Sequence, residues 1–256
     1  MLGRITRYNI SESFNVVRWM IGIITFAFVA VVSLAKYVNL AGITAITFSS
    51  VETLYLILND PTSIAYIYLP IYLFLICGLM FDDNFGSLEV IKSGSRGQWL
   101  LSKYLTLLFY TGVFFIFLIG LNFMISNQVF PYSDKWSSDF IKVQVIMGQS
   151  PANFSMTPLV TIGLSIASVF FMYLCIGTLS LVISLYTNRE VDALFFSLLT
   201  GIGVSMLFVF GLELTREMSA QAFMFRNMIL ITSTLILIGV ASHHVKYRDF
   251  NLSKRQ

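Results

Sequence analysis

The stretch LVTIGLSIASVFFMYLCIGTLSLVISLY, residues Leu159–Tyr186, contains no charged side chain. A bilayer has a hydrocarbon core about 30 Å thick, which about 20 mostly apolar residues cross as a helix. In lipid, only helices and closed barrels satisfy all of their own backbone hydrogen bonds. This stretch is therefore predicted to be a transmembrane helix, and it is long enough to tilt.

The composition of the whole chain is that of a membrane protein. Of the 256 residues, 57% are hydrophobic and 11% are charged, and the mean hydropathy is +0.80. An ordinary soluble domain is roughly 45–50% apolar and about 25% charged. The length allows one integral membrane domain over residues 1–256.

Six stretches are predicted to span the membrane, which makes the expected fold class an all-α integral membrane protein. They are approximately Trp19–Ala35, Ile64–Met80, Tyr104–Ser126, Leu159–Tyr186, Val191–Leu212 and Met228–Ala241. An even number of spans places both termini on the same side.

The basic residues predict which side that is. The side of the termini would hold eleven of the 16 Lys and Arg residues: Arg4, Arg7, Arg18, Lys92, Arg96, Lys103, Arg189, Lys246, Arg248, Lys254 and Arg255. The other side would hold five: Lys36, Lys135, Lys142, Arg216 and Arg226. Since basic residues favour the cytoplasmic side, both termini are expected in the cytoplasm. The chain is expected in the plasma membrane.

The segment Ile5–Val17 is predicted to be an amphipathic helix in the cytoplasmic interface. Apolar side chains recur there at roughly helical spacing, with Arg7, Glu12 and Asn15 between them. The alternative is a frayed basic tail that serves only the topology. No small-residue cleavage pattern follows, so no cleaved signal peptide is expected.

Three connections are expected on the outer side. Residues 36–63 and 127–158 are too long for tight hairpins and mix aromatic with polar residues, which favours partly ordered caps. Residues 213–227, between the fifth and sixth spans, are predicted to form a short helix of their own.

The sequence lacks the motifs of membrane enzymes and of nucleotide hydrolysis. It contains no HExxH, no nucleophile elbow and no GxxxxGK[ST] loop. His243 and His244 have no Cys, Asp or Glu at ligand spacing, so two interfacial polar residues are favoured over a metal site. We expect no catalytic residue, no metal and no bound cofactor in this chain.

Two further features limit the alternatives. The predicted spans carry no charge deep in their middle, which disfavours an ion-coupled carrier. Cys77 and Cys175 both lie in apolar runs, where thiols behave as small hydrophobes, and a disulfide between them is left open.

The polar insert between the second and third spans, DDNFGSLEVIKSGSRGQWLLSK, covers Asp82–Lys103. Apolar residues in each half flank the turn Gly94–Gly97, which predicts a helix, a tight turn and a second helix that leads into the third span. Such a hairpin on the cytoplasmic side has the shape of a docking surface for another protein.

The insert resembles the signature of type 2 ABC exporter permeases. Members typically have an acidic residue, a Gly-Thr-Leu-Glu-like tetrad, a Pro/Gly-x-Ser-Arg turn and a Lys that opens the third span. Here Asp82 and Asp83 precede Gly86-Ser87-Leu88-Glu89, and Ser93-Gly94-Ser95-Arg96 and then Lys103 follow. Ser87 stands where the family commonly has Thr, and the turn lies about two residues closer to the tetrad than the pattern expects.

The resemblance implies a coupling-helix hairpin that binds a separate ATPase subunit, which would bind ATP and Mg²⁺. The residues implied in this coupling are Asp82, Asp83, Gly86, Ser87, Leu88, Glu89, Ser93, Gly94, Ser95, Arg96 and Lys103. A second permease copy or paralogue would complete the transport path, and no nucleic acid is involved. For Arg96 and Lys103 the alternative is that they only anchor a helix at the membrane surface.

The expected function is export from a bacterial cell, with an antimicrobial peptide as the first cargo considered and drugs, lipids and polysaccharide precursors left open. Aromatic and Met residues of the fourth and fifth spans are candidates for the substrate path, with lipid contact or helix packing as the alternative: Phe170, Phe171, Tyr173, Phe195, Phe196 and Met206. Two other classes of protein stay open. One is a non-transporting sensor, scaffold or immunity protein, and the other is a secondary carrier or channel.

Overall fold

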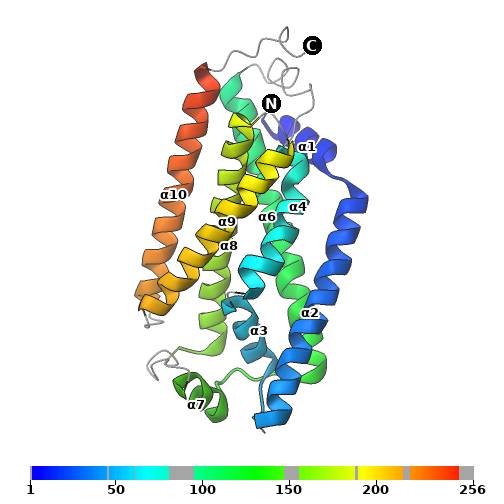
Figure 1. The fold of residues 1–256 in the computed structure, drawn as a ribbon, viewed down its shortest axis with the longest axis vertical. Coiled ribbons are helices and arrows are strands. Elements are labelled where there is room, and N and C mark those ends of the chain that lie inside the picture. Colours follow the sequence, from blue (N-terminus) through cyan, green and yellow to red (C-terminus); the bar gives the residue numbers. More distant parts are fainter. Residues whose placement is uncertain are drawn as a thin grey trace.

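The computed structural model describes residues 2–44, 46–60, 62–80, 95–146, 156–187, 190–215 and 220–247. All regular elements within these ranges are helices (Figure 1). They are α1 (Leu2–Ser13), α2 (Val16–Thr44), α3 (Ser50–Asn59), η1 (Ser63–Tyr68), α4 (Leu69–Met80), α6 (Arg96–Val129), α7 (Ser138–Ile146), α8 (Pro158–Tyr186), α9 (Glu190–Thr215) and α10 (Ala220–Tyr247). The predicted all-helical fold is confirmed.

Five of these helices are long and apolar enough to cross a membrane: Val16–Gly42, Arg96–Val129, Pro158–Tyr186, Val191–Phe208 and Gln221–Lys246. They form an elongated bundle, in which α1 lies across one end and α3 and α7 lie at the other (Figure 1). We call these the α1 end and the α7 end. Large apolar side chains such as Phe28, Ile116 and Leu207 point out of the bundle, as expected where lipid is the solvent.

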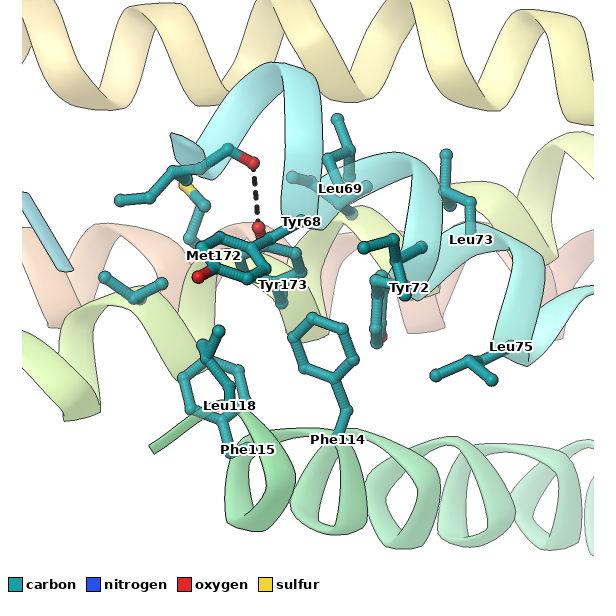
Figure 2. Packing of buried hydrophobic residues seen from close by; sticks show 14 of the residues in the cluster. Tyr68, Leu69, Tyr72, Leu73, Leu75, Phe114, Phe115, Leu118, Met172 and Tyr173 are labelled. Atoms are coloured by element: carbon teal, nitrogen blue, oxygen red, sulfur yellow. Dashed lines mark hydrogen bonds between the residues drawn. The ribbon is translucent and has the colours of Figure 1, made fainter. Parts of the chain in front are cut away.

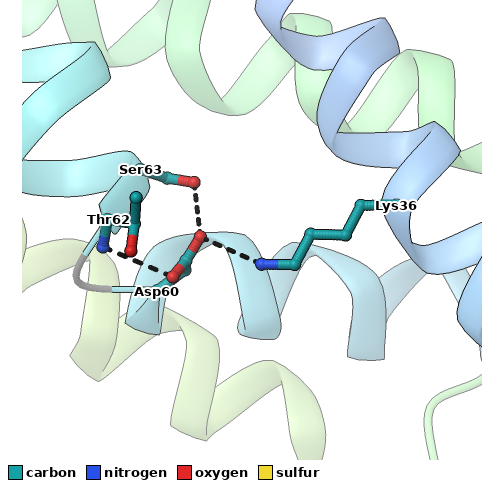
Figure 3. Close-up of polar contacts among 4 residues, drawn as sticks. All are labelled: Lys36, Asp60, Thr62 and Ser63. Atoms are coloured by element: carbon teal, nitrogen blue, oxygen red, sulfur yellow. Dashed lines mark hydrogen bonds and ion pairs between the residues drawn. The ribbon is translucent and has the colours of Figure 1, made fainter.

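The predicted second span is a bent pair of helices. The segment Ser63–Leu79 is long enough only when it is joined to Ser50–Asn59, and the two parts meet at an angle of 69°. At the break the Asp60 carboxylate accepts from the Thr62 backbone N–H at 3.3 Å and from the Ser63 hydroxyl at 2.6 Å, and Lys36 Nζ lies 3.5 Å from it (Figure 3). This bent pair is either one broken span, which would be a sixth crossing, or a re-entrant segment.

The prediction that residues 36–63 form an outer cap is wrong. Helix α2 continues to Thr44, and α3 is buried between α6 and α8 instead of covering them. A capping box begins α3: the Ser49 side chain accepts from the Glu52 N–H at 3.1 Å, and the Glu52 carboxylate accepts from the Ser49 N–H at 2.8 Å. Residues 127–158 do contain a helix, α7.

The separate helix predicted over residues 213–227 is also wrong. Helix α9 continues to Thr215 and α10 begins at Ala220, so the predicted helix is divided between its two neighbours in the described residues. A hydrophobicity pattern locates the apolar centre of a span but not the polar turns by which its helix extends beyond the lipid.

The helix predicted over Ile5–Val17 lies over Leu2–Ser13, and Val16 and Val17 begin α2. Cys77 in α4 and Cys175 in α8 are not joined by a disulfide.

Buried aromatic rings hold the bundle together where η1, α4, α6 and α8 meet (Figure 2). The Tyr72 ring lies edge-on to Phe114 and to Tyr173, with centroids 5.1 Å apart in each pair. The Tyr173 hydroxyl donates to the Ile64 carbonyl at 2.8 Å, which also accepts the backbone N–H of Leu69, five residues along the chain. The Ile64 carbonyl of the π-helical turn η1 is therefore shared between the backbone of Leu69 and a side chain of α8.

Candidate functional site

Several helix termini lie together at the α1 end, including the two that flank the predicted coupling segment in sequence. Helices α4, α8 and α10 end there, and α6 and α9 begin there, beside α1 (Figure 1). Of the predicted coupling residues, Asp82, Asp83, Gly86, Ser87, Leu88, Glu89, Ser93 and Gly94 lie outside the described residues. Ser95, Arg96 and Lys103 are described.

Ser95 is the N-cap of α6. Its backbone is extended, with φ −155° and ψ 145°, and its hydroxyl accepts the Gln98 backbone N–H at 3.2 Å. A helix begins with N–H groups that have no partner within it, and an N-cap hydroxyl satisfies one of them. The predicted second half of the insert is therefore the first part of a helix that continues unbroken to Val129.

Arg96 connects the start of α6 to the end of α10. Its Nη1 donates to the carbonyl oxygens of Lys246 at 2.8 Å and of Val245 at 3.3 Å. The last carbonyls of a helix have no partner within it and carry the negative end of its dipole, so a guanidinium there stabilises the helix end. Arg96 thus has a contact within the chain that a sequence pattern does not reveal.

Lys103 is nearly buried, with 5% of its surface exposed. Its ammonium lies 5.9 Å from the centroid of the Trp99 ring, one turn earlier in α6. This position differs from that of Ser95 and Arg96, which lie in the more exposed first residues of the helix. Lys103 therefore faces the protein, whereas Ser95 and Arg96 lie at the accessible start of α6.

Helix α1 is attached to α6 by buried and partly buried polar contacts. Asn9 Nδ2 donates to the Ser102 hydroxyl at 2.8 Å, and the Ser13 and Tyr110 hydroxyl oxygens are 2.8 Å apart. Tyr110 also donates to the Ile10 carbonyl at 3.0 Å. The sequence pattern did not predict these contacts. The available signal was an Asn and a Ser one turn apart, at positions 9 and 13 of a predicted amphipathic helix.

The end of α8 contacts the end of α10. The rings of Tyr186 and His244 have centroids 4.1 Å apart and are inclined by 37°. His243 and His244 both belong to the last turns of α10. Among the described residues, no group of three or more His, Cys, Asp or Glu side chains is arranged to hold a metal ion.

The candidate substrate-path residues do not share one surface. Tyr173 is fully buried in the aromatic core, and Phe170 packs edge-on against Phe115 with centroids 5.3 Å apart. Phe195 and Phe196 are exposed on α9. The two others, Phe171 of α8 and Met206 of α9, are partly buried.

Comparisons with protein-family models, with curated proteins and with solved structures find no match for this chain. The resemblance to type 2 ABC exporter permeases therefore depends on residues 82–103 and on the order of the helices. At the α1 end, the first two turns of α6 form hydrogen bonds with both α1 and α10.

Proposed function

We propose that this chain is the permease subunit of an ATP-driven type 2 ABC exporter, with the α1 end in the cytoplasm. The observation that supports this most is the set of contacts made by the start of α6. Arg96 bonds to the end of α10, and Ser102 and Tyr110 bond to α1. A partner that binds residues 82–96 would therefore act on α1, α6 and α10 together.

In the proposed mechanism, a separate ATPase subunit binds and hydrolyses ATP and changes its own conformation. A ligand shifts a conformational equilibrium only if it binds the two states with different affinity. The ATPase would favour one arrangement of α6 and α10 when ATP is bound and another when it is not. Two permease copies would then alternate between states open to opposite sides.

The cargo in this proposal is hydrophobic or amphipathic, with a peptide as the first candidate. Aromatic side chains of α8 and α9 offer apolar contact surface, and the exposed Phe195 and Phe196 are the members of the set available to a second copy or to cargo. Tyr173 has a packing role in the core, so we keep it outside the cargo surface.

The proposal is tested by co-purification of the whole chain with candidate ATPases that carry GxxxxGK[ST]. Glu89→Arg is expected to weaken binding of the ATPase more than tenfold, because reversing a charge at an interface places like charges together. Lys135→Glu is the matched control, since Lys135 is exposed at the α7 end.

Arg96→Glu is the second variant, and it is compared with Arg96→Lys, which keeps a cation beside the carbonyls of α10. We expect Glu to abolish ATPase binding and Lys to retain part of it. Undiminished binding in both Glu89→Arg and Arg96→Glu would contradict the proposal. Flux in vesicles that contain neither ATPase nor ATP would instead identify a channel or carrier.

A further inference from the structure

Arg226 lies near the start of α10, at the α7 end, and its guanidinium lies over two aromatic rings. Its Cζ atom is 4.6 Å from the centroid of Phe208 in α9 and 4.7 Å from that of Phe223 in α10. Both rings are buried, with 7% and 2% of their surface exposed. The Arg226 Nε is also buried and makes no hydrogen bond.

No described carboxylate neutralises this cation. The ion pairs within the described residues join Lys36 to Asp60 and Lys142 to Asp139. A guanidinium keeps its charge under all ordinary conditions, and a charge taken out of water is costly unless an opposite charge accompanies it. Charged residues inside membrane spans face a partner, a cavity or a ligand pathway for this reason.

The surroundings of Arg226 indicate what kind of partner could reach it. Neighbouring side chains on α10, Phe225, Met228 and Ile229, are exposed and apolar, as expected of a lipid-facing surface. Rings stacked on a guanidinium contact its faces, while its N–H donors project in the plane of the group. The N–H donors of a guanidinium form a planar fork, which can bind two oxygens of a phosphate or carboxylate at once.

We propose that Arg226 binds the phosphate group of an anionic lipid from the leaflet at the α7 end, with Phe208 and Phe223 holding the guanidinium in place. A lipid fits this site, because its chains cover the exposed apolar side chains of α10 and its phosphate supplies a negative charge that no described carboxylate supplies. Such binding does not require an exporter, so its test is independent of the function proposed above.

The test measures binding of phosphatidylglycerol and of phosphatidylcholine to the purified full-length chain in detergent, by titration under native mass spectrometry. The wild type is expected to prefer phosphatidylglycerol. Arg226→Gln should weaken phosphatidylglycerol binding about tenfold or more, which is the loss expected for a hydrogen bond between charged groups. Lys142→Gln is the matched control, since it removes one positive charge from an exposed side chain at the same end.

Phe208→Leu keeps the cation and removes one of its two rings, so it tests the site even if Arg226→Gln folds poorly. We expect a several-fold loss of phosphatidylglycerol binding and no change for phosphatidylcholine. A third ligand, glycerol phosphate, distinguishes the source of the phosphate. If it competes fully with phosphatidylglycerol, the site takes its phosphate from a soluble ligand, and the lipid is not the occupant.

Phosphatidylglycerol binding that is unchanged in Arg226→Gln would overturn the proposal, and so would either of two further results. One is a wild type without preference between the two lipids and without glycerol phosphate binding. The other comes from a double-mutant cycle in which Glu217→Gln and Arg226→Gln each lower the thermal stability. The loss of stability in the double variant would then differ from the sum of the two single losses. That second result would show that an acid of the chain itself neutralises Arg226.

Discussion

At the scale of single residues, Gly177 of α8 shows how closely the bundle is packed. A Cβ atom built on Gly177 would overlap the Tyr72 hydroxyl oxygen and would lie 2.9 Å from Leu107 Cδ1. Tyr72 cannot easily move, because it is fully buried and its hydroxyl lies 2.9 Å from that of Thr111. Only a glycine lets α4, α6 and α8 approach to this distance.

We expect Gly177→Ala to destabilise the protein by about 1–3 kcal/mol, the usual range for adding a methyl group to a filled core. Thermal unfolding in detergent measures the effect. Gly163→Ala in the same helix is the control, because nothing lies within 4 Å of its Cβ position, and it should be neutral or stabilising. Equal effects of the two substitutions would show that the contact with Tyr72 is not close.

At the scale of elements, α3 is a helix buried on nearly all sides and held by Glu52. The Glu52 side chain is fully buried, and besides the Ser49 N–H it accepts the Ser137 backbone N–H at 2.6 Å, just before α7. Trp136 stacks on Phe140 with centroids 5.2 Å apart and lies edge-on to Tyr55. One carboxylate therefore both begins α3 and joins it to the segment that leads into α7.

Glu52→Gln is expected to lower the free energy of unfolding by about 1–3 kcal/mol, because the amide offers a donor where one of the two N–H groups needs an acceptor. Asp139→Asn is the matched control, since Asp139 forms only an exposed ion pair with Lys142 and should change stability by less than about 1 kcal/mol. Proteolysis between α6 and α7 should accelerate in Glu52→Gln alone. Unchanged stability in this variant would mean that Glu52 does not hold the two elements together.

The elements also show what the sequence could predict. Apolar runs such as Leu159–Tyr186 identify spans, because the preference for lipid is a property of the run itself. The burial of α3 could not be predicted, because Ser50, Glu52 and Thr53 have the polarity of a surface segment. Their partners lie far along the chain, as Ser137 does from Glu52.

The position of the candidate site in the chain could be predicted from the sequence, but its contacts could not. The composition of residues 82–103 indicates a polar connection on the side of the termini. The contact of Arg96 with Val245 and Lys246 depends on how α6 and α10 pack, which no local pattern contains. Asn9 and Ser102 were missed for the same reason.

At the scale of the whole molecule, polar contacts between distant segments lie at both ends and an aromatic core lies between them. At the α1 end, Asn9, Arg96 and Tyr110 join helices through hydrogen bonds. At the α7 end, Glu52 joins the start of α3 to the segment before α7. In the proposed exporter, the α1 end receives the force of the ATPase and the α7 end faces the outside of the cell.

Site-specific photo-crosslinking in the native host tests the central claim most directly. A photoreactive amino acid replaces Glu89 in one variant and Lys135, at the α7 end, in another. We predict that residue 89 forms an adduct with a protein that carries GxxxxGK[ST], and that residue 135 does not. The absence of an ATPase adduct at residue 89, or equal adducts at both positions, would contradict the account of this chain as an ATPase-coupled permease.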